Sequence, residues 1–240
     1  MKTTRLSAQR AFRRHPPTRQ AGATIVEFAI ISPIAILLVM GIIQFGLMFS
    51  AKQILNEATF VAARAGAEQN AQKSAMSTAL TTAMIPFYQN TFYTNPATRL
   101  ADAYGSALTD LPLNLDIAVL NPNADVFSDF GLTDATTNQT YIPNDSLEYR
   151  DHSWTGPTTG LTIQDANALK IRVTYAYELK VPLMQIVFKS VMCGIDSGVN
   201  AFGRGGSPIS PDCAQYYNRG RVPIVAYATV QMQSDAWPTN

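Results

Sequence analysis

The sequence predicts a membrane-anchored protein of the α+β class, in which one long N-terminal helix precedes a small antiparallel β-sheet domain with a further helix. Three observations lead to this prediction. A basic head is followed by a long uncharged apolar run, the run continues into a stretch with helical periodicity, and the last third alternates apolar and polar residues as strands do. The chain of 240 residues has room for one ordinary domain with appendages or for two small domains.

Charge is distributed unevenly along the chain. The net charge is only +1, and 15% of the residues are charged, which is below the roughly 25% usual for soluble domains. Six of the 18 cations and no acid lie in residues 1–22, whereas residues 23–240 hold 12 cations and all 17 acids. A small basic head on a mildly acidic body gives no reason to expect a nucleic-acid partner.

Residues 28–51 form an uncharged apolar run of 24 residues. As a helix this run would be roughly 36 Å long, which is enough to cross a hydrocarbon core of about 30 Å. We therefore predict a basic leader over residues 1–22 and a transmembrane helix over residues 23–51. A secretory signal peptide is the alternative, but its apolar region is only about 7–15 residues long. Because Lys and Arg stay preferentially in the cytoplasm, the N-terminus is expected inside and residues 52–240 outside.

Gly22, Glu27 and Phe28 have a distinctive spacing where the apolar run begins. A carboxylate within a membrane helix is costly and therefore indicates a function. Cleavage between Gly22 and Ala23 would make Glu27 the fifth residue and Phe28 the sixth, which is the pattern of type IV prepilins. The new amine could then pair with the Glu27 carboxylate of a neighbouring subunit. The alternative places Glu27 in the headgroup zone, where it only favours the positive helix N-terminus.

Further residues of the apolar run narrow this pattern. Val26-Glu27-Phe28-Ala29 is followed by Pro33 and by Gly41–Gly46 (GIIQFG) within the run, and Ala62-Ala63-Arg64-Ala65-Gly66-Ala67 comes after the run. These segments resemble the TadE-like proteins of the tight-adherence (Tad, or Flp) pilus system. Gln44 stands where that family often has a second acid within the membrane span. This chain therefore departs from the family pattern there, and no role of such an acid can be carried over to it. The resemblance is close over about residues 20–70, loose over the last third and absent over residues 86–165.

The resemblance implies a minor pilin or pseudopilin needed for assembly of Tad pili in adherence and biofilm formation. It implies processing by a prepilin peptidase and cooperation with other Tad pseudopilins, the major pilin and the inner-membrane assembly platform. It also implies a single-pass protein of the bacterial inner membrane with a periplasmic C-terminal domain, which could enter the surface pilus. A single-pass, membrane-anchored periplasmic binding protein unrelated to pili is the alternative.

The helical part is predicted to extend well beyond the membrane. Pro33 removes a backbone donor within the span, so we expect a helix kink there. One helix is expected from about Ala23 to Asn70. A second helical stretch over residues 71–85 continues the periodicity and ends before Pro86, so we expect an amphipathic helical stalk over residues 52–85.

Residues 86–165 are expected to form a variable, loop-rich region because Asn, Asp, Thr, Pro and Gly are frequent there. Within it, residues 113–120 alternate as a half-buried strand should. The motif Asn121-x-Asn123-x-Asp125 suggests a calcium loop. However, Val126 replaces the required glycine and Leu132 replaces the bidentate acid, so we expect no metal site.

Residues 166–240 are expected to form an antiparallel β region with a disulfide loop. Residues 169–181 and 222–233 both alternate and are predicted to pair. Between them, residues 182–191 (PLMQIVFKSV) predict a short amphipathic helix, which we expect on its own sheet, with the membrane or a neighbouring subunit as alternatives. Cys193 and Cys213 are expected outside the cytoplasm, where disulfides persist, and we predict that they form a bridge. Two unpaired buried thiols are the alternative.

The sequence contains no combination of residues typical of a catalytic site. His15 in the basic head and His152 in the body are the only histidines, which is too few for a His-rich metal site or a Cys/His zinc cluster. Asp151-His152-Ser153 resembles part of a catalytic triad, but triads are assembled from distant positions, so we expect an exposed loop histidine. We expect neither catalytic residues nor a cofactor.

Overall fold

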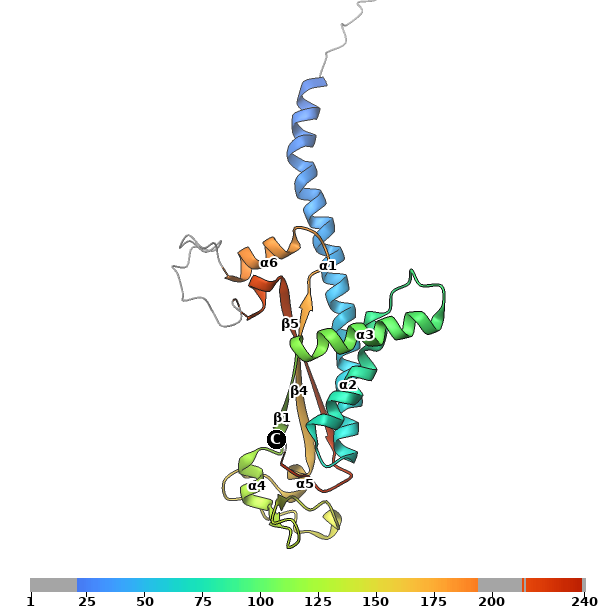
Figure 1. Cartoon of the computed structure of the whole chain (residues 1–240). Coiled ribbons are helices and arrows are strands. Elements are labelled where there is room, and N and C mark those ends of the chain that lie inside the picture. Colours follow the sequence, from blue (N-terminus) through green and yellow to red (C-terminus); the bar gives the residue numbers. More distant parts are fainter. Residues whose placement is uncertain (1–20, 194–212, 214, 239–240) are drawn as a thin grey trace, which may run out of the picture. The chain divides into compact units, whose positions relative to one another are not determined.

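The computed structural model describes residues 21–193, 213 and 215–238, with side chains described from residue 25 onward (Figure 1). The basic head therefore lies outside the described residues. The chain divides into two units, Met1–Gly41 and Ile42–Asn240. The first contains the beginning of helix α1, and the second contains the remainder of α1 and every other helix and strand described.

Helix α1 extends over 48 residues from Ala21 to Glu68 and continues through Pro33. It is the one described helix that is long and apolar enough to span a membrane. The expected long helix is thus confirmed, and it ends two residues before the expected Asn70. Asn70 adopts φ 57°, a left-handed conformation that Asn tolerates better than most residues. The Asn70 side chain donates to the Asp235 carbonyl at 2.8 Å, which attaches the end of α1 to the C-terminal segment.

A three-stranded antiparallel sheet is the centre of the second unit. Strand β4 (Ala168–Glu178) lies between β1 (Leu115–Asn121) and β5 (Arg221–Gln231). The pairing of β4 with β5 extends from Ala168 opposite Gln231 to Glu178 opposite Arg221, which confirms the predicted pair. Apolar residues at every second position of β4 are buried, as the alternation predicts: Leu169, Ile171 and Val173.

The second half of α1 and helix α2 (Lys73–Tyr88) pack their buried side chains with those of the sheet into one core. Met76, Leu80 and Met84 form the buried stripe of α2, as the periodicity predicts. The expected end before Pro86 is wrong, because α2 continues to Tyr88. A proline in the last turn removes a single helical hydrogen bond. The edge-on contact between Phe87 and Tyr175, with ring centroids 5.8 Å apart, helps to hold that last turn against the sheet.

Helix α3 (Pro96–Asn114) corrects the expectation that residues 86–165 consist mainly of loops. Asn95 caps it by accepting a hydrogen bond from the Ala97 N–H at 2.9 Å, and Pro96 occupies the first turn, where its missing donor costs nothing. Its buried face consists of Ala103, Ala107 and Leu111. Small alanines among polar residues give a weak apolar pattern, which is why the sequence analysis missed this helix.

The remaining described elements are short. Asn123 accepts a hydrogen bond from the Val126 N–H at 3.0 Å and so caps helix α4, which means that part of the calcium-like motif serves as a helix cap. These elements are α4 (Ala124–Phe130), β2 (Leu132–Thr133), β3 (Thr140–Tyr141), η1 (Leu147–Tyr149), α5 (Ile163–Ala166), α6 (Met184–Cys193) and η2 (Tyr217–Arg219).

Candidate functional site

The predicted assembly residues lie together on the first turns of α1. The backbones of Gly22 and Ala23 are helical, and their side chains lie outside those described. Glu27 and Phe28 are exposed, and Phe28 has 71% of its surface accessible. Pro33 is also exposed within the helix. The structure therefore places these residues on the first part of one helix, where the described side chains are exposed or half-buried.

Glu27 is a carboxylate on an apolar surface. Its helix neighbours Ile25, Val26 and Phe28 are all more than half exposed. Among the ion pairs of the described residues, none involves Glu27. Glu27 is therefore an exposed acid among apolar side chains, without an ion-pair partner in the described part of the chain.

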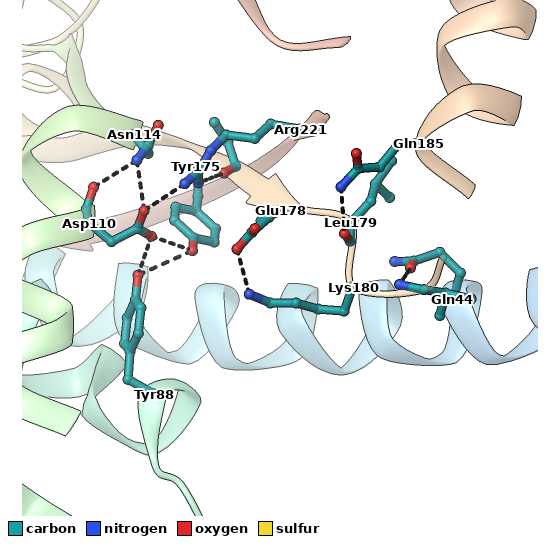
Figure 2. Close-up of polar contacts among 12 residues, drawn as sticks. Gln44, Tyr88, Asp110, Asn114, Tyr175, Glu178, Leu179, Lys180, Gln185 and Arg221 are labelled. Carbon is teal, nitrogen blue, oxygen red and sulfur yellow. Dashed lines mark hydrogen bonds and ion pairs between the residues drawn. The ribbon is translucent and has the colours of Figure 1, made fainter. Parts of the chain in front are cut away.

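Gln44 is the first residue of α1 whose side chain is buried in the second unit, Ile42–Asn240, which is called the folded unit below. From residue 25 to residue 43 the side chains are exposed or half-buried, and Gln44 is the first fully buried one. Its Oε1 accepts a hydrogen bond from the Val181 N–H at 2.9 Å, so it holds the segment that follows β4 (Figure 2). An amide can accept this bond without burying a charge. This contact gives a structural reason for an amide where the TadE-like pattern often has an acid.

The main polar cluster of the second unit surrounds Asp110 on α3. The hydroxyls of Tyr88 and Tyr175 donate to Asp110 Oδ2 at 2.7 and 2.8 Å (Figure 2). Arg221 Nη2 and Asn114 Nδ2 donate to Oδ1 at 2.9 and 2.7 Å. The cluster therefore joins α2, α3, β4 and β5 through one carboxylate.

The electrostatics of the cluster follow from its burial and its hydrogen bonds. Burial acts to raise the pKa of Asp110, but the bonds from Tyr88 and Tyr175 and the positive charge of Arg221 outweigh it, so this pKa is lowered. Burial is the largest cause that raises the pKa of Tyr88 and of Tyr175, so both hydroxyls remain protonated donors. A carboxylate has about four acceptor sites. Because all four are occupied, Asp110 stabilises the fold and has no acceptor site left for a ligand.

An open groove of about 1560 Å³ lies beside this cluster. Its wall is partly apolar and partly polar, and it is formed by α1, the α2–α3 segment and the ends of β4 and β5. Representative lining residues are Leu47, Ile54, Phe92, Asp102 and Lys180. Within the described residues no group of His, Cys, Asp and Glu side chains could hold a metal ion.

The two cysteines are joined. Cys193, the last residue of α6, forms a disulfide with Cys213, and their Cα atoms are 5.6 Å apart. The bridge anchors the end of α6, and the glycine-rich loop that it closes lies outside the described residues. His152 is exposed, as expected of a loop histidine.

Sequence reasoning missed the Asp110 cluster. One signal pointed toward it, because alternation assigns Tyr175 to the buried face of β4 and a buried tyrosine hydroxyl usually needs a partner. That partner lies 65 positions earlier, in a helix that the sequence analysis did not find. Periodicity alone could not have identified it.

The segment that carries the predicted assembly residues was compared with known proteins. Residues 22–64 match a family model described as TadE-like protein. The match begins at Gly22, includes Glu27, Phe28, Pro33 and Gln44, and ends within α1. No curated protein and no solved structure matches the chain significantly. The TadE-like match associates the chain with the membrane and with the Tad pilus system, and the resemblance to that family is confirmed over residues 22–64.

Proposed function

We propose that this chain is a minor pilin or pseudopilin needed for assembly of Tad (Flp) pili, and through them for adherence and biofilm formation. The observation that carries the proposal is the TadE-like match over residues 22–64. Within that segment, Gly22 and Glu27 have prepilin spacing on a helix whose apolar side chains are exposed. An exposed apolar helix of this kind can lie in a membrane before assembly and can pack against the helices of neighbouring subunits after it.

Processing and assembly use different residues of this segment. A membrane prepilin peptidase cuts between Gly22 and Ala23 and releases the basic leader. The new amine of Ala23 carries a positive charge, and the Glu27 carboxylate of a neighbouring subunit pairs with it. In a low-dielectric environment this pair attracts more strongly than it would in water. The pair sets the axial position of each subunit relative to the next as it leaves the membrane.

The proposed topology is that of a single-pass inner-membrane protein. The basic leader keeps the N-terminus in the cytoplasm, and the folded unit lies in the periplasm. The disulfide between Cys193 and Cys213 supports this orientation, since such bonds persist in oxidising compartments. The proposed partners are the prepilin peptidase, other Tad pseudopilins, the major pilin and the inner-membrane assembly platform. The proposal assigns the chain no enzymatic activity.

Deleting the chain from its own cells tests this function. We expect loss of Tad pili by electron microscopy and in the sheared surface fraction, together with loss of surface adherence. Expression of the wild-type chain in the deletion strain should restore all three. Normal pili in the deletion strain would contradict the proposal.

The groove beside the Asp110 cluster supports a second candidate function, that of a binding protein. An open groove of about 1560 Å³ in the folded unit suits a membrane-anchored periplasmic binding protein. That function predicts normal pili in the deletion strain and a retained leader, because it assigns no role to the spacing of Gly22 and Glu27.

A further inference from the structure

The part of α1 that is accessible to lipid ends where its side chains become buried in the folded unit. The predicted span continues to Ala51, but Gln44 and Ala51 are buried against the folded unit. The nineteen residues from 25 to 43 are exposed or half-buried. A helix of that length covers roughly 28 Å, close to the hydrocarbon thickness of about 30 Å. A membrane surface therefore falls near Gln44 and Phe45.

Helix α6 lies beside α1 at this level. The rings of Phe45 on α1 and Phe188 on α6 are 5.8 Å apart, and Gln44 binds the backbone just before α6. Within the described residues the main packing partner of α6 is η2. The inner side of α6 packs through Phe188 against the core that α1 and the sheet share, and Met184 is buried, in line with the expectation, while its other side is left exposed.

The exposed surface of α6 and of Leu183 just before it is mostly apolar, with Gln185 and Lys189 as its exposed polar side chains. Leu183, Ile186, Val191 and Met192 are between 52% and 65% exposed, whereas Met184 is buried and Phe188 packs on the core. Residues 181–193 contain one cation, Lys189, and no acid. Exposed apolar side chains beside a cation are the composition of a helix that lies in a membrane interface.

The apolar surface continues from α6 to α1. Phe45 and Phe49 are 62% and 67% exposed, and they lie in the same uncharged run as the span. Between α1 and β5 they border a mostly apolar hollow of about 530 Å³, which Pro223 and Ile224 complete. The exposed apolar surface beside α6 thus includes residues of the uncharged run itself.

We propose that α6 is a membrane-interface helix. It inserts Leu183, Ile186, Val191 and Met192 at the boundary between headgroups and acyl chains, and Lys189 contacts anionic lipid headgroups. The occupant is the bilayer and not a second protein, because Phe45, which contacts Phe188 of α6, belongs to the same uncharged run as the predicted span. The proposal does not depend on the role of the chain in pili.

Quenching by brominated lipid tests this placement in the full mature chain. Cysteine is introduced by Ile186→Cys and labelled with an environment-sensitive fluorophore, while Cys193 and Cys213 stay protected in their disulfide. The chain is reconstituted in vesicles of phosphatidylcholine and phosphatidylglycerol with bromine near the carbonyl end of the acyl chains. We expect the label to lose about half or more of its emission relative to unbrominated vesicles, as suits a face buried ~5–10 Å deep.

Two matched positions control the measurement. Ile36→Cys lies in the span and must be quenched if the chain is inserted, whereas Leu132→Cys lies on β2, on an exposed apolar residue far from α6, and should keep its emission. Lys189→Glu should reduce the quenching at residue 186 only when phosphatidylglycerol is present. Emission at residue 186 equal to that at residue 132, with residue 36 quenched, would overturn the proposal. The proposal would also be overturned if the emission of the label at residue 186 changed when unlabelled chain was added and did not change with bromine. That result would indicate that a second copy of the chain covers α6.

Discussion

At the scale of single residues, Glu27 is the only acid between the basic head and Lys52. Glu27→Gln keeps its shape and polarity and removes its charge. We expect the Gln form to be processed and inserted normally, but to be lost from pilus assembly or to recruit the major pilin poorly. If Glu27 only favoured the helix N-terminus, the effect would be mild, about 0.3–1 kcal/mol on one helix end. Piliation and co-purification, in a strain that carries only the Gln form, measure the difference.

Glu57→Gln is the matched control, because Glu57 is an exposed acid on the same helix, outside the lipid-accessible part. It should leave piliation unchanged. Wild-type piliation and recruitment by the Glu27 variant would show that its carboxylate is dispensable.

Gly22 and Glu27 should separate processing from assembly. Gly22→Ala is expected to slow cleavage, because the residue lies at the scissile bond. Glu27→Ala should leave cleavage largely intact and damage assembly, because charge pairing is a separate step. Pulse–chase labelling followed by separation of precursor from mature chain gives the cleavage rate of each variant. Equal cleavage rates for both variants would contradict this division of roles.

The Asp110 carboxylate stabilises the folded unit by accepting hydrogen bonds from four different side chains. Asp110→Asn replaces a carboxylate that accepts four hydrogen bonds by an amide. The amide N–H groups would then face the N–H and O–H donors of the cluster. Since charged hydrogen bonds are involved and the site is partly exposed, we expect a loss of about 1–3 kcal/mol in the free energy of unfolding. Chemical denaturation of the full mature chain in detergent measures it. Asp102→Asn, on an exposed position of α3, should change little.

The same carboxylate predicts a dependence on pH. Because the folded state lowers the pKa of Asp110, its stabilisation is complete above the unfolded pKa of about 3.9 and is lost as the pH falls through the folded pKa. The difference in unfolding free energy between wild type and Asp110→Asn should therefore be constant near neutral pH and shrink below pH ~4. A difference that grows on acidification would contradict the assignment.

At the scale of elements, Gly66 permits the close approach of α1 to α2 and β4. A Cβ at Gly66 would lie 2.7 Å from Met76 Cγ and 2.9 Å from Leu169 Cδ2. Gly66→Ala should therefore destabilise the folded unit by about 1–3 kcal/mol through overpacking. Gly105→Ala is the opposite control, because nothing lies within 4 Å of a Cβ there. Within helix α3 it should stabilise by roughly 0.5–1 kcal/mol. Thermal unfolding midpoints that move in the same direction for both variants would contradict this packing.

The elements also show what the sequence could and could not predict. Strands β4 and β5 and the buried stripe of α2 follow from periodicity, because each buries one face against the core. Helix α3 escaped because its buried face is mostly alanine, and the end of α2 was misplaced because contacts of Phe87 and Tyr88 extend the helix past Pro86. The bond between Arg221 and Asp110 in this cluster joins residues 111 positions apart. Such tertiary contacts leave no trace in local spacing.

At the scale of the whole molecule, the N-terminal unit and the folded unit have different kinds of surface. From residue 25 to residue 43 the helix is apolar with little of it buried, whereas the second unit has its own core, a satisfied polar cluster and a disulfide. The assembly residues were predicted from sequence because prepilin spacing is local, within six residues of Gly22. They remain predictions, since pairing between subunits involves a second chain.

The intact mass and N-terminal peptide of the protein, purified from its own cells with an active prepilin peptidase, test the proposed function most directly. We expect a mature chain that begins at Ala23, with Glu27 fifth and Phe28 sixth, and no detectable leader. A mature chain that still begins at Met1 in those cells would contradict the pilin function.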